Sequence, residues 1–154
     1  MAKRRKTPRA AKEESRAAWR IHFFQRHAAD DPSRAVPARD FLERCPVAPR
    51  MAAILKAVAE APPHAFAGGG YWEAMHGKMG GYYEVRVDGP NRIHYRLFCV
   101  LEHDGEHLGL GGPSIVVITG MEKAFQTTFS ERDYERVRQL GEEYQSRFPR
   151  SVLR

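Results

Sequence analysis

The segment from Gly81 to Val100 limits the possible folds more than any other part of the chain, because it has the pattern of two strands joined by a tight turn. Its sequence, GYYEVRVDGPNRIHYRLFCV, alternates apolar and polar residues on both sides of a Gly-Pro-Asn turn signal. In a strand, every second side chain points to the same face. A hairpin loop at Gly89–Asn91 then predicts three facing pairs, which are Asp88 with Arg92, Arg86 with His94, and Glu84 with Arg96.

The two faces of this predicted hairpin differ in their chemistry. One face is apolar and is expected to point to the core, with Tyr83, Val85, Val87, Ile93, Tyr95, Leu97 and Cys99. The other face brings four polar side chains within about 4.5 to 8 Å of one another, and these are Glu84, Arg86, His94 and Arg96. The pattern therefore predicts a charged group on an open sheet face.

The remaining strands are predicted from short aromatic and β-branched runs between glycines and prolines. A first strand is expected at Trp19–Phe24, and a meander of antiparallel strands is expected after Gly68. Its members are Tyr71–Met75, Tyr82–Val87, Arg92–Leu101 and Ser114–Met121. The polar, glycine-rich stretch HDGEHLGLGGP between the last two strands is expected to be an inserted loop.

Two helices are predicted between the first strand and the meander. Pro37–Arg44 has helical composition and ends before Pro46, because the residue before a proline disfavours the helical region. A second helix begins at Pro49 and ends at Pro62, and its apolar stripe is Met51, Ile54, Leu55 and Val58. These helices are expected to form a hairpin that covers one face of the sheet.

A last helix is predicted to begin at Ser130, whose hydroxyl can cap the amide of Asp133. Its buried side is predicted to be Tyr134, Val137, Leu140 and Tyr144. The order of strands and helices indicates one α+β domain with an N-terminal strand and a C-terminal helix.

Positive charge is concentrated at the N-terminus. The chain has 154 residues and a formal net charge of +6. Residues 1–16 contain seven basic and two acidic side chains, so this segment carries +5 and the rest of the chain +1. We expect a disordered basic tail before a domain at residues 17–148. The tail either aids solubility or binds RNA phosphates, with Lys3, Arg4, Arg5 and Lys6 as the RNA-binding residues.

Several functional classes are disfavoured by composition and spacing. The apolar runs are far shorter than the roughly 20 residues of a membrane span, and no secretory signal is recognisable, so we expect a cytoplasmic protein without a membrane partner. Walker-loop and triad signatures are missing. His103 and His107 have no cysteine partner in their loop, so neither a metal site nor a cofactor is expected. Cys45 and Cys99 are expected to be small apolar residues.

The polar face of the hairpin suits RNA cleavage through the RNA's own 2′-hydroxyl. That reaction needs a base near the 2′-oxygen, positive charge on the phosphate, and a proton for the departing 5′-oxygen. Arg86 and Arg96 supply charge, and His94 can carry protons. Lys123 can join them from the last strand, and Lys78 and Gln126 are weaker RNA-binding candidates. The alternative is that Glu84 and Arg96 only form a solvated cross-strand ion pair.

Three motifs in this order resemble a known family. They are YYEVR at Tyr82–Arg86, HYRLF at His94–Phe98 and VVITGMEKAFQTT at Val116–Thr128. The chain between Trp19 and Tyr144 resembles the RelE/ParE toxin superfamily, and within it the HigB branch, which includes phage-derived proteins. The resemblance implies a RelE-like α+β fold, with a helical hairpin packed on a twisted antiparallel sheet.

The resemblance also implies a function. Members of the HigB branch are toxins of type II toxin-antitoxin systems that cleave mRNA on the ribosome without a metal. Position by position, the family's basic residues fall on Arg86, Arg96 and Lys123. The expected partners are mRNA, the ribosome and a helix-turn-helix antitoxin encoded next to the toxin.

This chain departs from the family pattern near its last strand. Ala124 replaces the second lysine of a lysine pair, Met121 replaces an aromatic residue, and Phe129 replaces a proline. Two other functions therefore stay open. One is inhibition of DNA gyrase without catalysis, as in the ParE branch, and the other is a degenerate phage-derived protein that only binds RNA or a partner.

Overall fold

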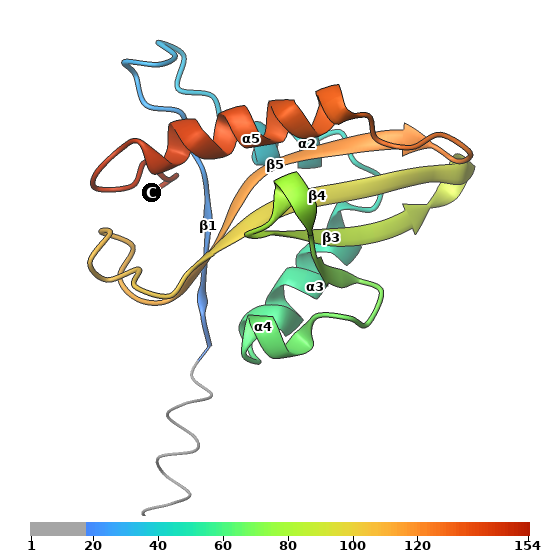
Figure 1. Ribbon diagram of the computed structural model, residues 1–154, viewed down its shortest axis with the longest axis horizontal. Helices are drawn as coiled ribbons and strands as arrows, with labels where there is room; N and C mark the ends of the chain where they lie inside the picture. Colours follow the sequence, from blue (N-terminus) through green and yellow to red (C-terminus); the bar gives the residue numbers. More distant parts are fainter. Residues whose placement is uncertain (1–17) are drawn as a thin grey trace, which may run out of the picture.

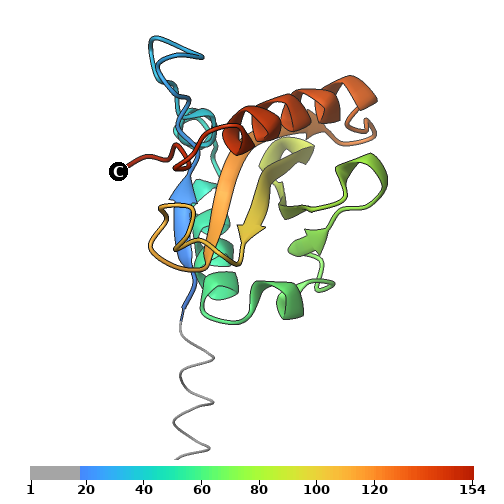
Figure 2. The same ribbon diagram turned by 60° about the vertical axis from the view of Figure 1, so that its left-hand side comes forward.

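A five-stranded mixed sheet with helices on both faces forms the folded part of the chain. The structure is a computed structural model, and it describes residues 18–154. The predicted tail, with Lys3, Arg4, Arg5 and Lys6, lies outside the described residues. Figures 1 and 2 show the three layers, with α5 on one face of the sheet and α2 and α3 on the other. The α+β class is confirmed.

The strands lie close to their predicted positions, but one pair of neighbouring strands differs from the prediction. They are β1 (Arg20–Phe23), β2 (Trp72–Ala74), β3 (Tyr82–Gly89), β4 (Ile93–Glu102) and β5 (Ser114–Ala124), in the spatial order β1-β5-β4-β3-β2. Strands β2 to β5 pair antiparallel, whereas β1 pairs parallel with β5. The expectation of a purely antiparallel sheet was therefore wrong. A parallel pair needs a long crossover, and the helices after β1 provide part of it.

The helices are α2 (Pro37–Leu42), α3 (Ala48–Ala59), α4 (Pro63–Phe66) and α5 (Glu131–Gln145). Both predicted helices, α2 and α3, are present, and they cover the same face of the sheet. The short helix α4 was not predicted, because Pro63 was interpreted only as the end of the preceding helix. Proline also suits a first helical turn, and here the Pro63 carbonyl accepts a hydrogen bond of 2.8 Å from the Trp72 indole.

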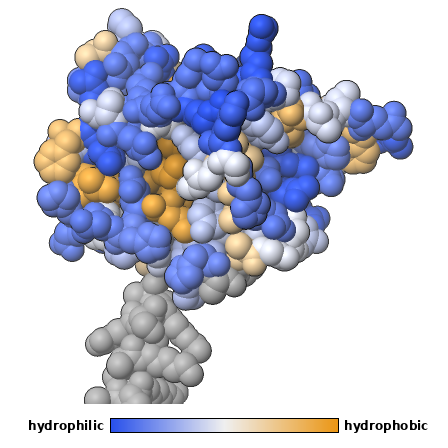
Figure 3. All heavy atoms as spheres, in the orientation of Figure 1, coloured by the Kyte–Doolittle hydropathy of each residue, from blue (hydrophilic) through white to orange (hydrophobic). Residues whose placement is uncertain are grey.

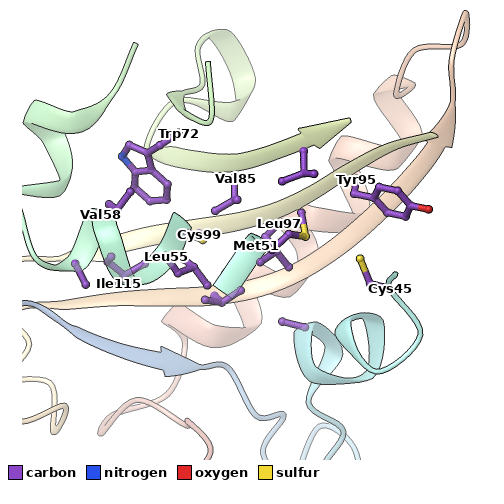
Figure 4. Packing of buried hydrophobic residues seen from close by; sticks show 14 residues of the cluster. Cys45, Met51, Leu55, Val58, Trp72, Val85, Tyr95, Leu97, Cys99 and Ile115 are labelled. Carbon is purple, nitrogen blue, oxygen red and sulfur yellow. The ribbon is translucent and has the colours of Figure 1, made fainter. Parts of the chain in front are cut away.

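The first core lies between the sheet and the helices α2 and α3. Figure 4 shows Met51, Leu55 and Val58 of α3 directed toward the sheet strands. The predicted apolar face of β3 and β4 points into this core, with Tyr83 and Ile93 at its partly buried edge. Cys45 and Cys99 are free and buried, as predicted. Burial raises the pKa of the Cys99 thiol, so this side chain packs as an apolar group.

The second core lies under α5, on the opposite face of the sheet. Ser130 and Asp133 form a reciprocal capping box at the start of the helix, which satisfies amides that would otherwise lack partners. Val137, Leu140 and Tyr144 are buried as predicted, and Tyr134 is partly buried. The sheet contributes further buried side chains, which are Phe98, Val100, Val116 and Ile118. The sheet face that we expected to be open is therefore largely covered.

The turn between β3 and β4 lies one residue later than predicted. Pro90–Arg92 forms a short turn of 3-10 helix, and Asn91 and Arg92 adopt left-handed φ angles of 62° and 57°. The facing pairs are Arg86 with Arg96, Asp88 with His94, and Glu84 with Phe98. The predicted register was therefore wrong. Each partner moves by two positions, which leaves every side chain on its predicted face.

The loop after β4 and the chain after α5 pack against each other and against β1. Leu110 of the predicted loop is buried, and its carbonyl lies 3.0 Å from Nε2 of His22. Val152 is buried and forms an isolated β-bridge with Phe24. The chain beyond residue 148, where we expected the domain to end, thus contributes to the core.

Candidate functional site

A cavity of about 240 Å³ opens where β3, β4 and the chain before α5 meet. Its walls come from three segments that are distant in sequence. The lining residues are Glu84, Arg86, His94, Arg96, Thr127, Thr128, Phe129 and Tyr134. Three of the four predicted catalytic residues, Arg86, His94 and Arg96, are therefore brought together.

Arg96 is the most buried charged group of this cavity, with only 6% of its surface exposed. Its Nη1 donates to the carbonyl of Tyr95 at 2.9 Å and to Oδ1 of Asp88 at 3.2 Å. Its Nε lies 3.7 Å from Oε1 of Glu84. Among the described residues, Nη2 has no hydrogen-bond partner. The ion pair between Glu84 and Arg96 exists, but it is buried, so the alternative of a solvated pair was wrong.

Glu84 lies between two cavities. It lines the first cavity and also a neighbouring one of about 380 Å³, and Tyr134 lines both. Burial raises the pKa of Glu84 above its ordinary value of 4.5, although Arg86 and Arg96 act in the opposite direction. A carboxylate whose pKa is shifted toward neutrality is suited to accept and release a proton. Sequence reasoning had given Glu84 only the role of an ion-pair partner.

His94 is oriented by two neighbours. Its Nδ1 lies 2.7 Å from Oδ1 of Asp88, and its ring stacks on Phe125 with 4.5 Å between ring centroids. A carboxylate at Nδ1 favours the tautomer with the proton on that nitrogen, which leaves Nε2 as the basic nitrogen. The hydrogen bond from His94, together with Arg96, lowers the pKa of Asp88. Asp88 therefore stays ionised and holds the imidazole in place.

Arg86 faces Arg96 directly across the β3–β4 ladder. Two like charges in facing positions repel each other unless an anion lies near both. Glu84 and Asp88 surround Arg96, whereas Arg86 forms no ion pair with any carboxylate of residues 18–154. Arg86 is half-buried and lines the cavity. It is therefore the cation best placed to contact an incoming phosphate.

The other predicted site residues lie outside this cavity. Lys123 is opposite His94 in the β4–β5 ladder, but its Nζ forms an ion pair of 3.2 Å with Asp133 in the first turn of α5. Lys78 lines the neighbouring cavity and pairs with Glu131 at 3.5 Å. Gln126 is exposed at the tip of a turn, with a φ angle of 71°. None of these three side chains lines the cavity of the site.

Sequence reasoning missed the wall formed by the chain between β5 and α5. Thr127, Thr128 and Phe129 line the cavity, and Tyr134 was predicted only as a core residue. Burial and the nearby charge of Glu84 raise the pKa of the Tyr134 hydroxyl, so it stays protonated and can donate a hydrogen bond. The available signal was the capping box at Ser130, since it fixes where the helix starts and thus where the preceding residues lie.

The histidines of the glycine-rich loop are separated in the structure. His103 contacts the Trp19 ring edge-on at a centroid distance of 5.0 Å, and His107 lies 5.5 Å from the Phe148 ring. Within the part of the chain that the structure describes, no three His, Cys, Asp or Glu side chains are grouped so that they could hold a metal ion. In the same residues, no helix is both long and apolar enough to span a membrane.

A comparison of the chain with protein-family models, with curated proteins and with solved structures finds no match in any of the three.

Proposed function

We propose that this protein is the toxin component of a type II toxin-antitoxin system and acts as a ribosome-dependent mRNA endonuclease that uses side chains without a metal. One observation carries the proposal. A single cavity holds a partly buried carboxylate of raised pKa, two arginines and an oriented histidine, and these are Glu84, Arg86, Arg96 and His94. Base, phosphate-binding charge and acid are the three requirements of cleavage through a 2′-hydroxyl.

The proposed reaction assigns one role to each group. Glu84 accepts the proton of the 2′-hydroxyl, and the 2′-oxygen then attacks the phosphorus. Arg86 and Nη2 of Arg96 stabilise the negative charge that develops on the phosphate oxygens. His94, protonated on Nε2, gives that proton to the 5′-oxygen as the phosphorus–oxygen bond breaks. The products carry a 2′,3′-cyclic phosphate and a free 5′-hydroxyl.

Lys123, Lys78 and Gln126 are proposed to contact the RNA at the rim of the cavity. Lys123 and Lys78 pair with Asp133 and Glu131 of α5, and contacts with RNA phosphates would replace these ion pairs. The basic segment before residue 17 adds charge for the ribosome or for RNA. The proposed antitoxin is a helix-turn-helix protein encoded next to this chain, and it would inhibit the toxin by covering the cavity or distorting it.

The proposal is tested by inducing the chain without its neighbouring gene and mapping new 5′ ends in cellular mRNA. We expect growth arrest and new ends with the wild type, and neither with Arg86→Ala. Arg136→Ala is a matched control, because Arg136 is exposed on α5 and does not line the cavity. Growth arrest with intact mRNA and DNA damage would indicate gyrase inhibition instead, and no arrest would indicate a protein that only binds.

A further inference from the structure

A cavity of about 610 Å³, larger than either cavity of the candidate site, lies beside the last turn of α5. Its charged lining is entirely basic and comes from the loop after β1 and from the C-terminal segment. The lining includes His27, Arg34, Arg147, Phe148, Arg150 and Arg154. Since α5 has 15 residues and a helix rises 1.5 Å per residue, about 22 Å separate the two ends of the helix. This cavity is thus distinct from the catalytic cluster at the first turn.

The four arginines of the cavity divide into two pairs. Arg147 pairs with Asp30 at 2.9 Å, and Arg150 pairs with Glu102 at 3.4 Å, so these two are largely neutralised. Arg34 and Arg154 form no ion pair with a carboxylate of the described chain. Arg34 donates to Oε1 of Gln25 at 3.3 Å, and Arg154 to the Gly109 carbonyl at 2.9 Å. Both bonds are to neutral acceptors, so the positive charge of each guanidinium is available to an anion.

Arg34 occupies a backbone conformation that arginine rarely adopts. Its φ angle is +53°, in the left-handed region that favours glycine. The carboxylate of Asp31 holds this turn, because it accepts hydrogen bonds from the amides of Ser33 and Ala35. Glycine would relieve the strain, yet the chain carries an arginine whose side chain lines the cavity. An unfavourable conformation combined with an un-neutralised charge is typical of a functional position.

Phe148 adds an exposed aromatic ring to the basic lining of the cavity. Of the large hydrophobic residues that the structure describes as exposed, it has the highest exposure, at 67%. Figure 3 shows a mostly hydrophilic face, with apolar atoms reaching the surface on the side of the C-terminal segment and the loop after β4. An exposed aromatic ring among cations is the arrangement with which proteins bind single-stranded nucleic acid, through base stacking and phosphate contacts.

We propose that this cavity is a second RNA-binding site, which stacks an unpaired base on Phe148 and binds the adjacent phosphates through Arg34 and Arg154. The identity of the ligand as RNA rests on the proposed function. Because the site lies about 22 Å along α5 from the catalytic cavity, it binds nucleotides that flank the cleaved bond rather than the bond itself. It therefore contributes to affinity for RNA and leaves the chemical step unchanged.

The test measures binding separately from cleavage. A fluorescently labelled, fully 2′-O-methylated RNA oligonucleotide cannot be cleaved through its 2′-oxygen, and its affinity is measured by anisotropy over a range of salt concentrations. Phe148→Ala should weaken binding about tenfold at every salt concentration, which is the order expected for one lost base stack. Arg34→Gln should weaken binding and reduce the slope of log affinity against log salt by about 0.7, the value for one phosphate contact on a single strand.

Matched controls lie elsewhere on the surface. Tyr71→Ala removes another exposed aromatic side chain, and Arg39→Gln removes an exposed arginine of α2 on the other side of the sheet. Both should bind as the wild type does. Arg34→Gly should lose as much affinity as Arg34→Gln without a lower melting temperature, because it relieves the left-handed strain. Inorganic polyphosphate has no bases, so its affinity, measured by competition with the labelled RNA, should be the same for the wild type and Phe148→Ala.

The proposal is overturned if the wild type does not bind this RNA, or if Phe148→Ala and Arg34→Gln bind within twofold of the wild type. It is also overturned if Phe148→Ala lowers the affinity for polyphosphate as much as the affinity for RNA, since the ring would then not contact a base. These outcomes are independent of cleavage. If the wild type leaves mRNA intact but the variants lose RNA binding, the result would support this RNA-binding site and contradict the proposed nuclease activity.

Discussion

At the scale of single residues, the two arginines of the candidate site have the same chemistry but different surroundings. Arg96 is buried and is held by Glu84, Asp88 and backbone carbonyls. Arg86 faces it across the ladder, lines the same cavity and has no carboxylate partner among the residues that the structure covers. A buried charge that loses its partner is destabilising by several kcal/mol, so Arg96 has a structural role that Arg86 lacks.

Alanine substitution should separate these roles. Arg96→Ala removes the buried cation that lies within ion-pair distance of both Glu84 and Asp88, and we expect the free energy of unfolding to fall by about 3 to 5 kcal/mol. Arg86→Ala should change stability by no more than about 0.5 kcal/mol and slow RNA cleavage about 100-fold, as expected when one preorganised charge-stabilising donor is lost. Urea unfolding and cleavage assays on both variants provide the comparison. A stable Arg96→Ala variant would contradict the buried-pair interpretation.

Glu84 should make both stability and cleavage depend on pH. Because burial raises the pKa of Glu84 above 4.5, the Glu84 carboxyl group stays protonated to a higher pH in the folded protein than in the unfolded chain. Ionisation therefore reduces stability as the pH rises from 4.5 toward neutrality. Glu84→Gln cannot ionise, so its free energy of unfolding relative to the wild type should increase over that window. Carboxyl groups with a lowered pKa, such as Asp88, change the stability only at pH values below this window.

Cleavage by Glu84→Gln completes this prediction. We expect a rate loss of about 10² to 10⁴-fold, which is the usual contribution of a general base, and no remaining rise of the residual rate with pH across the acid range. Unfolding curves and pH–rate profiles measured in the same buffers would check both effects. A variant that keeps the wild-type profile would show that another group accepts the proton.

At the scale of elements, α5 fixes the geometry of the site. The capping box places its first turn, Asp133 of that turn binds Lys123, and Tyr134 forms part of the cavity wall. The buried side of the helix meets β3 and β4 through Tyr82, Phe98 and their neighbours. The distance between helix and sheet therefore determines the size of the cavity.

Gly141 sets that distance. A Cβ atom built at Gly141 would clash with the hydroxyl of Tyr82. Alanine normally stabilises a helix by about 1 kcal/mol relative to glycine, but we expect Gly141→Ala to lower stability by about 1 to 3 kcal/mol, because overpacking forces the helix away from the sheet. Removing the hydroxyl in the double variant Gly141→Ala/Tyr82→Phe should restore most of the loss. Thermal unfolding of both variants checks this, and a higher melting temperature for Gly141→Ala alone would contradict it.

The elements differ in how well their sequences predicted them. Alternation in β3 and β4 predicted both faces, because the side-chain period is a local property of a strand. The facing pairs were wrong, since the register depends on whether the turn is centred on Pro90 or on Asn91. The parallel pairing of β1 with β5 leaves no local signal, because it is determined by long-range packing. The cover provided by α5 over Arg96 and Glu84 was missed for the same reason.

At the scale of the whole molecule, α5 lies along one face of the sheet, as Figure 1 shows. The lining residues place a different cavity beside each end of this helix. The candidate catalytic cavity lies beside the first turn, which contributes Tyr134, and the basic cavity with Phe148 lies beside the last turn. The chain after residue 16 carries a net charge of only +1, because its 18 lysines and arginines are matched by 17 acidic side chains. We therefore propose that specific arginines without a carboxylate partner among the described residues, rather than overall charge, provide contacts with an anion.

We propose above that the cavity cleaves RNA through the RNA's own 2′-hydroxyl. The most direct test of this proposal is to identify the ends of the products by mass spectrometry, using purified protein and ribosome-bound mRNA, with Arg86→Ala and Glu84→Gln as comparisons. We expect 2′,3′-cyclic phosphate and 5′-hydroxyl ends from the wild type and strongly reduced product from both variants. A message with a single 2′-deoxy nucleotide at the cleaved position should give no product. Products with 5′-phosphate ends, or unchanged cleavage by both variants, would contradict the proposal.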